Sequence, residues 1–254
     1  MNLTKSEFCA MLCRAIEAND PDGTLLPYLT DARADAFYAL TEQMLSVNAQ
    51  MNLTAITEPS DILVKHYADC ARIVPHIPQN ARLCDVGTGG GFPSLPVAIL
   101  RPDVSITAVD STQKKLAYVA ATASRLGLTN LRTLASRAEV LGTDPTFRES
   151  FDCVTARAVA RMNVLCEWCL PLLGQDGLFL AMKGRGGMEE HAEAASAIRI
   201  LGGETVSASP YALLDPFSEA EESDMARVLI TVRKTRRTPD KYPRQNAQIA
   251  KKPL

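Results

Sequence analysis

The sequence predicts an α/β protein in which a mostly parallel sheet of seven strands follows an N-terminal helical region. From Ala81 to about residue 234, short β-rich runs alternate with helical stretches, which is typical of a parallel sheet covered by helices on both faces. Before Ala81, apolar residues recur at helical rather than strand spacing. We therefore expect a helical cap over residues 1–78, a sheet domain over 79–234 and a basic tail over 235–254.

Three helices are expected in the N-terminal region. Pro21-Asp22-Gly23 ends the first, Thr30 or Asp31 begins the second, and Ser60 or Asp61 begins the third. Their apolar stripes are Phe8, Met11, Leu12, Ala15 and Ile16; Phe37, Leu40, Met44 and Val47; and Ile62, Leu63, Tyr67, Cys70 and Ile73. His66 and Asp69 share a face of the third helix, either as a substrate contact or as a surface ion pair.

The strands of the sheet are expected at residues 81–86, 104–109, 131–134, 151–155, 178–182, about 204–208 and 226–233. The helices between them are expected at residues 93–100, 113–126, 164–173 and 189–201. An acidic stretch at residues 215–224 is expected to be a solvated loop. In such sheets, ligands bind beyond the carboxyl ends of the strands, where the strand order reverses. The residues that follow the strands are therefore the candidates for a site.

The first strand runs into a turn that contains four glycines, between Leu83 and Pro93. Glycine is required where φ is unusual or where the backbone lies against a ligand. A dinucleotide fingerprint would need a further glycine where Phe92 or Ser94 stands. The pattern acid-x-G-x-G-x-G, which begins at Asp85, instead resembles the first motif of class I S-adenosylmethionine (SAM) methyltransferases. By itself this motif leaves other nucleotide ligands open, and also a structural turn without a ligand.

Asp110 follows the second strand and stands 23 residues after Gly87. Rossmann-type domains place an acid that binds ribose hydroxyls about 20 residues beyond the glycines. A nucleoside ligand is the interpretation that this spacing favours, while a helix cap by Asp110, Ser111 or Thr112 is compatible with the same spacing. Cations after the third to fifth strands, among them Arg137 and Arg157, suit a polyanionic acceptor.

Composition indicates an ordinary globular chain of 254 residues, with 46% hydrophobic residues and a net charge of −2. No apolar run approaches the about 20 residues of a membrane span, so we expect a cytoplasmic protein without membrane contact. Seven cysteines in an odd, scattered set fit a reducing compartment. Cys166 and Cys169 form a C-x-x-C on an expected helix, but the chain has only three histidines, and no metal site is expected.

Residues 233–254 contain eight Lys and Arg residues against one Asp, a net charge of +7 in an otherwise acidic chain. Such a concentration of positive charge is expected for a protein that contacts a phosphate backbone. A solvated tail without a partner is equally compatible with the charge alone.

A family resemblance rests on motifs spread over nearly the whole chain. They are Asn52-Leu53-Thr54-Ala55-Ile56-Thr57-Glu58-Pro59, Lys65-His66, Asp69, the stretch Asp85 to Pro93, Asp110-Ser111, the stretch Thr155 to Arg161, Lys183-Gly184, the stretch Thr238 to Arg244 and Lys252-Pro253-Leu254. Together they resemble the bacterial small-subunit ribosomal RNA guanine-N7 methyltransferases, also called glucose-inhibited division protein B. The resemblance implies a Rossmann-like class I fold and SAM-dependent methylation of N7 of a guanine in the 530 loop of 16S rRNA. The implied partner is 16S rRNA or the small ribosomal subunit, and we expect a monomer.

The glycine turn, the strand ends and the resemblance together give the expected site. The cofactor-binding candidates are Asp85, Gly87, Gly89, Gly91, Phe92, Asp110, Ser111, Thr112, Ala138, Glu139 and Arg157. The RNA-binding candidates are Arg161, Lys183, Arg185, Arg236, Arg237, Lys241, Arg244, Lys251 and Lys252. Arg157 is assigned either to the SAM carboxylate or to an RNA phosphate. Because N7 of guanine carries a lone pair and no proton, no catalytic base is expected. A small-molecule methyltransferase and a nicotinamide oxidoreductase are the rival hypotheses.

Overall fold

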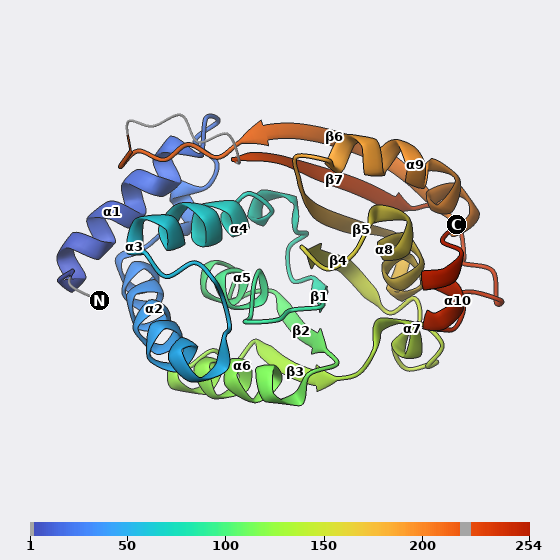
Figure 1. Cartoon of the computed structure of the whole chain (residues 1–254), viewed down its shortest axis with the longest axis horizontal. Coiled ribbons are helices and arrows are strands. Elements are labelled where there is room, and N and C mark those ends of the chain that lie inside the picture. Colours follow the sequence, from blue (N-terminus) through green and yellow to red (C-terminus); the bar gives the residue numbers. More distant parts are fainter. Residues whose placement is uncertain (1–2, 219–224) are drawn as a thin grey trace.

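The computed structural model describes residues 3–218 and 225–254, so that residues 219–224 of the expected acidic loop lie outside the described residues. Its centre is a seven-stranded sheet in the order β3-β2-β1-β4-β5-β7-β6, in which β7 runs antiparallel to both of its neighbours (Figure 1). The strands are β1 Arg82–Val86, β2 Ser105–Asp110, β3 Leu131–Ala135, β4 Phe151–Arg157, β5 Leu173–Gly184, β6 Gly203–Ala212 and β7 Ala226–Lys234. The expected sheet is therefore confirmed, including its mostly parallel character.

Helices connect the strands and precede them. They are α1 Lys5–Ala18, η1 Leu26–Tyr28, α2 Asp31–Met51, α3 Pro59–Asp61, η2 Ile62–Ala68, α4 Asp69–Ala71, η3 Val74–His76, α5 Ser94–Leu100, α6 Gln113–Arg125, α7 Ala138–Leu141, α8 Met162–Cys169, η4 Leu170–Leu172, α9 Gly187–Ile200 and α10 Asn246–Lys251. The third expected helix is α3, η2 and α4 in succession, with η2 a π-helix.

The structure differs from the sequence-based expectation in two short helices that were not expected, in the end of α8 and in the start of β5. The helices α7 and α10 span four and six residues, too few to show a helical period. The helix expected over residues 164–173 ends as α8 at Cys169, because Pro171 lies in the 3₁₀ turn η4 that follows. The strand β5 then begins at Leu173, which pairs with Phe151.

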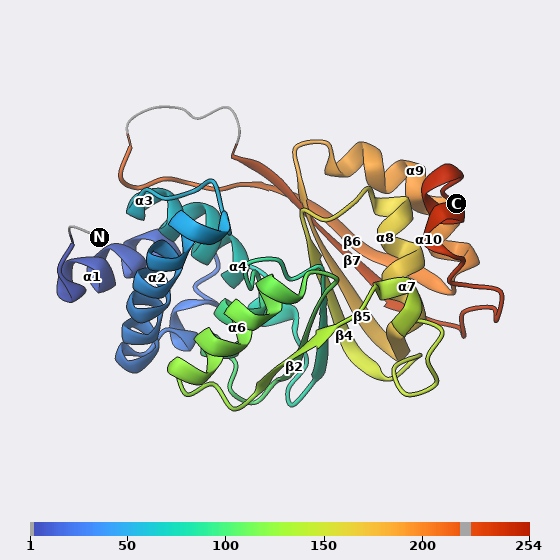
Figure 2. The ribbon, with the colours of Figure 1, turned by 60° about the horizontal axis from the view of Figure 1, so that its bottom comes forward.

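The sheet lies between two helical layers (Figure 2). One layer holds the N-terminal helices with α5 and α6, and the other holds α7, α8, α9 and α10. Phe8, Phe37 and Tyr67 are 0–1% exposed and share one hydrophobic cluster with Leu83 of β1. The N-terminal region is thus built into the core of the sheet domain, and the core continues across residue 78.

The C-terminal residues pack on the second layer rather than extending as a free tail. Thr238 and Tyr242 are buried, and Ile249 of α10 is fully buried. Figure 1 shows α10, in red, beside α8, and the two helices are in contact. The alternative of a freely solvated tail is corrected, because apolar residues that interrupt its charges pack against the domain. Binding of RNA by the exposed cations of this segment stays a prediction. Across residues 3–218 and 225–254, no helix has both the length and the apolarity needed to cross a membrane.

Candidate active site

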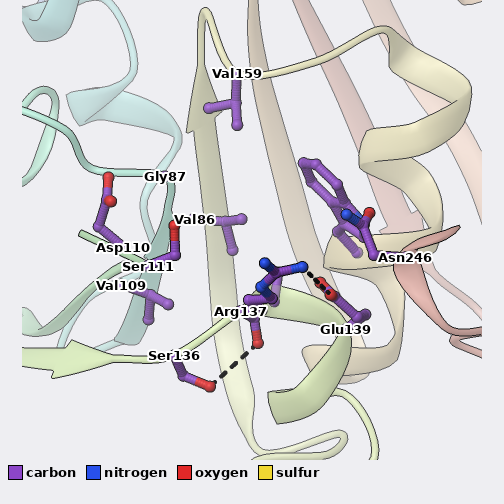
Figure 3. Close-up of a pocket in the computed structure, with 12 residues that line it drawn as sticks. Val86, Gly87, Val109, Asp110, Ser111, Ser136, Arg137, Glu139, Val159 and Asn246 are labelled. Atoms are coloured by element: carbon purple, nitrogen blue, oxygen red, sulfur yellow. Dashed lines mark hydrogen bonds and ion pairs between the residues drawn. The ribbon is translucent and has the colours of Figure 1, made fainter. Parts of the chain in front are cut away.

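A cavity of about 320 Å³ opens beyond the ends of β1, β2 and β3, beside the point where the strand order reverses between β1 and β4. Five of the predicted cofactor residues line it: Gly87, Asp110, Ser111, Ala138 and Glu139. Figure 3 shows Asp110 and Ser111 on one side of the cavity and Glu139 and Asn246 on the other. The position follows the rule for ligand sites in open α/β sheets.

The glycine turn forms one edge of this cavity, and its glycines are needed for different reasons. Gly87, Gly89 and Gly91 have φ values of 73°, 55° and 91°, which side-chain-bearing residues rarely adopt. A Cβ on Gly87 would lie 2.7 Å from Cγ2 of Val159, and one on Gly91 would lie 2.5 Å from Cδ1 of Leu95. A Cβ on Gly89 would lie 3.9 Å from the Gly87 carbonyl oxygen, an ordinary contact distance, so conformation alone requires glycine there.

Asp110 ties the glycine turn to the segment after β2. Its Oδ2 accepts a hydrogen bond of 3.0 Å from the Gly89 amide, and its Oδ1 accepts one of 2.8 Å from the Thr112 amide. A carboxylate oxygen has two lone pairs, so each oxygen can still accept a hydrogen bond from a ligand hydroxyl. The helix-capping and ribose-binding interpretations of Asp110 are therefore compatible. Thr112 is itself exposed at the start of α6.

Asp85 does not line the cavity, although the sequence predicts that it holds the methionine end of SAM. Its side chain is fully buried, where Oδ2 accepts from Ser94 Oγ at 2.6 Å and Oδ1 accepts from Thr155 Oγ1 at 2.9 Å. Burial raises the pKa of this carboxyl, and the hydroxyl hydrogen bonds oppose that rise. We therefore correct the prediction that Asp85 contacts SAM directly. Its carboxylate instead joins β1 to β4 and α5 beneath the glycine turn.

Phe92 and Arg157 belong to a buried cluster on the side of the N-terminal helices. The Phe92 ring stacks on His66 with 4.4 Å between ring centroids. Arg157 donates to Asp69 Oδ2 at 3.0 Å and to His66 Nδ1 at 2.9 Å. Because arginine can only donate, the proton of His66 is on Nε2, which donates to Thr54 Oγ1 at 2.9 Å. Burial and the charge of Arg157 lower the pKa of His66 to about 3, so the imidazole is neutral.

A second cavity of about 400 Å³ lies on this side of the loop that follows β4. His66, Asp69 and Arg157 line it, and so does Arg185 at its exposed rim. Ala158 lines the second cavity and Val159 lines the first, so one loop of the backbone separates them. A group transferred between ligands in the two cavities would pass this loop.

Two of the predicted RNA-binding cations are paired with carboxylates of the same chain. Lys183 is 8% exposed, and its Nζ donates to Glu190 Oε2 and to the Ala160 carbonyl, each at 2.7 Å. Arg244 donates two side-chain hydrogen bonds to Glu167, which is fully buried. We correct the prediction that these two cations are free to bind RNA, because each neutralises a carboxylate of the same chain.

The other RNA-binding candidates remain at the surface, with different degrees of engagement. Arg161 pairs with Glu193 and Arg237 with Glu149, while Arg236 donates to the Arg199 carbonyl and Lys241 lies over the Tyr242 ring. Arg185, Lys251 and Lys252 are exposed. Arg185 makes no ion pair with any residue in the part of the chain that the structure describes.

Seven of the residues that line the cofactor cavity were not among the predicted cofactor residues. Three of these seven, Val159, Trp168 and Asn246, lie outside the glycine turn, the strands β1, β2 and β3 and the segments that follow these strands. They come from the loop after β4, from α8 and from α10. Neither a motif nor a periodicity marks Trp168 or Asn246, although Trp168 is the single tryptophan of the chain, whereas Val159 lies in the stretch Thr155 to Arg161 that carries part of the family resemblance. Among the described residues, no group of three or more His, Cys, Asp or Glu side chains is arranged to hold a metal ion.

The family model for rRNA small subunit methyltransferase G, named GidB, matches residues 33–212 of the chain. The chain belongs to this family. The Ribosomal RNA small subunit methyltransferase G of Oceanobacillus iheyensis is 42% identical over 228 residues, which cover 89% of this chain and 93% of the relative. The expectations of a methyltransferase, and of membership in this family, are thereby confirmed.

Solved structures show the same fold at low sequence identity. TYW2 of M. jannaschii in complex with AdoMet has a TM-score of 0.51 at 12% identity, covering 74% of this chain and 80% of its own. A SAM-dependent O-methyltransferase of Thermotoga maritima has a TM-score of 0.50 at 15% identity, covering 77% of this chain and 72% of its own. The Rossmann-like class I methyltransferase fold is thereby confirmed. This fold and the membership in a methyltransferase family together support SAM as the cofactor. The roles of individual site residues stay predictions.

Proposed function

We propose that this protein transfers the methyl group of SAM to N7 of a guanine in the 530 loop of 16S rRNA. Membership in the rRNA small subunit methyltransferase G family is the observation that carries the proposal. The choice of N7 and of the 530 loop rests on the resemblance of the motifs. When bound, the cofactor supplies an electrophilic methyl group on a sulfonium sulfur.

The first cavity has the chemistry that this cofactor requires. Its volume of about 320 Å³ lies at the lower end of the roughly 300–1,000 Å³ of ligand pockets. We assign Asp110 to the ribose hydroxyls, Ala138 and Glu139 to the adenine, and the backbone of the glycine turn to the methionine end. Asp85 contributes by holding the turn through Ser94.

We assign the second cavity to the acceptor guanine. Arg157 lines this cavity and not the first, which favours a role toward RNA over one toward the SAM carboxylate. Its guanidinium makes three side-chain hydrogen bonds, to the Lys65 carbonyl, Asp69 and His66, and has five N–H groups. N–H groups therefore remain for guanine O6 or a phosphate. Arg185 at the rim is the cation best placed to meet the RNA backbone.

Positioning accounts for the reaction in this arrangement. N7 attacks the methyl group with its own lone pair, so the residues of the site need remove no proton before the transfer. His66 is neutral and uses both ring nitrogens in hydrogen bonds, which suits it to orient Arg157 rather than to act as a base. Alignment of two bound reactants can contribute roughly 7–11 kcal/mol to the lowering of a barrier.

The test is transfer of labelled methyl from SAM to small ribosomal subunits that lack this modification, followed by nucleoside analysis. We expect the label in 7-methylguanosine, and we expect Asp110→Ala to reduce its incorporation when SAM is below saturation. Label in another nucleoside, or incorporation only into protein, would refute the proposal. Naked 16S rRNA is tested in parallel, because it distinguishes free RNA from the assembled subunit as substrate. A ribosomal substrate implies a cytoplasmic enzyme, and the monomeric state stays a prediction.

A further inference from the structure

The C-terminal helix reaches the cofactor cavity. Asn246, the first residue of α10, lines the cavity that also contains Gly87 and Asp110. Figure 3 shows its side chain on the same side of the cavity as Glu139, across from Asp110. Within the described part of the chain, the side-chain amide of Asn246 makes no hydrogen bond, so its NH₂ group and its carbonyl oxygen are available to a ligand.

An ion pair holds the residues just before Asn246 against α8. Glu167 is fully buried and accepts three hydrogen bonds from Arg244: from its backbone amide at 2.8 Å, from Nε at 2.8 Å and from Nη2 at 2.6 Å. Such a bidentate pair defines direction as well as distance. Trp168, the neighbour of Glu167, lines the cavity. The pair therefore fixes α10 relative to a wall of the cavity.

A second attachment joins the same segment to α7. Arg148 donates to the Gly142 carbonyl at 2.7 Å, to the Tyr242 carbonyl at 2.8 Å and to the Thr238 carbonyl at 2.8 Å. A Cβ on Gly142 would lie 2.8 Å from Cγ of Pro243, so the segment lies directly on the end of α7. That helix also carries Glu139, on the cavity wall that Asn246 adjoins.

We propose that the C-terminal segment 242–251 is a wall of the SAM cavity, in which Asn246 binds the adenine edge and the Glu167–Arg244 pair positions it. A nucleoside whose ribose lies at Asp110 presents its base toward Glu139 and Asn246. The amide of Asn246 offers one acceptor and donors, which match the amino group and a ring nitrogen of adenine. This inference rests on the proposed function in that it takes the cavity to bind SAM.

Fluorescence of Trp168 provides a direct binding assay, because it is the only tryptophan and it lines the cavity. S-adenosylhomocysteine is titrated into the wild type, Asn246→Ala and the matched control Gln248→Ala, which removes an exposed amide from the same helix. We expect Asn246→Ala to weaken binding about tenfold, the effect of one or two hydrogen bonds, and Gln248→Ala to leave it unchanged. Thermal unfolding checks that both variants are folded.

The adenine contact is tested with S-inosylhomocysteine, in which a carbonyl oxygen replaces the amino group of the base. We expect the wild type to prefer the adenine compound, and we expect this preference to shrink in Asn246→Ala by the factor lost in affinity. An unchanged preference would overturn the assignment of Asn246 to the base.

The positioning role of the ion pair is tested with Arg244→Lys, which keeps the charge and loses the bidentate geometry. We expect weaker binding of S-adenosylhomocysteine in the wild-type background and no further loss in the Asn246→Ala background. Equal losses in both backgrounds would show that Arg244 affects binding independently of Asn246 and would overturn its positioning role.

Two further outcomes separate this inference from the proposed function. Unchanged cofactor affinity in Asn246→Ala, with reduced methylation of small subunits, would make α10 an RNA contact and overturn the inference while the proposed function stands. A wild-type protein that binds no S-adenosylhomocysteine would overturn the proposed function and the inference with it.

Discussion

Substitution of Gly87 by alanine tests the link between the glycine turn and the cofactor cavity. The residue has a φ of 73°, and its Cβ would lie 2.7 Å and 2.8 Å from the two methyl carbons of Val159. Gly127 is a matched control, since its φ is 67° and nothing lies within 4 Å of its added Cβ. The two substitutions share the conformational strain, but only the first creates a steric clash.

The magnitudes follow from these two terms. A left-handed conformation costs a residue with a Cβ roughly 1–2 kcal/mol, which is the loss of unfolding free energy that we expect for Gly127→Ala. Overpacking adds about 1–3 kcal/mol, so Gly87→Ala is expected to lose about 2–5 kcal/mol in all. Displacement of Val159 narrows the cavity, so the affinity for S-adenosylhomocysteine should fall in Gly87→Ala and not in Gly127→Ala.

Chemical denaturation gives the two free energies, and Trp168 fluorescence gives the affinities. In the double variant Gly87→Ala, Val159→Ala, the clash is removed, so we expect a favourable coupling energy of about 1–3 kcal/mol between the two sites. Equal stability and equal affinity of the two alanine variants would refute the reasoning, because strain would then be the whole effect.

Three further predictions concern charge. The pKa of His66 is depressed to about 3 from an ordinary 6.5, so its contribution to stability is present above pH 6.5 and is lost as the pH falls. The loss of unfolding free energy between pH 7.5 and pH 5 is about 2 kcal/mol. His66→Gln should flatten the pH profile of the unfolding free energy by that amount. Asp110→Ala should weaken binding of S-adenosylhomocysteine by about ten- to a hundredfold in a direct titration, through lost charge-assisted hydrogen bonds. Asp144→Ala, which removes a partly exposed carboxylate away from the cavity, should leave this binding unchanged. Arg185→Ala should reduce the slope of log activity against log salt by about 0.7–0.9, whereas Lys183→Ala should lower stability and leave the slope as it is; an unchanged slope in Arg185→Ala would remove this residue from the RNA interface.

The sequence by itself determined the features that short stretches of chain encode. The alternation of strands and helices from Ala81 onward depends on local periodicity, and each of the seven strands overlaps its expected range. The glycines at 87, 89 and 91 all have positive φ, a conformation that the run of glycines already indicated because glycine adopts it without a steric penalty. Asp110 follows from spacing along one β-α-β unit, so its place at the cavity was predictable as well.

Only the tertiary structure decided which side chains meet across the chain. Lys183 and Arg244 carry the same charge as Arg185 in the sequence, yet the first two are paired with Glu190 and Glu167 while Arg185 is exposed. Trp168 and Asn246 reach the cofactor cavity from α8 and α10, whose positions cannot be predicted from the glycine turn at Gly87. The reason is physical. Whether a cation is solvated, or a helix end faces a cavity, depends on packing between distant segments of the chain, and a local sequence pattern does not determine that packing.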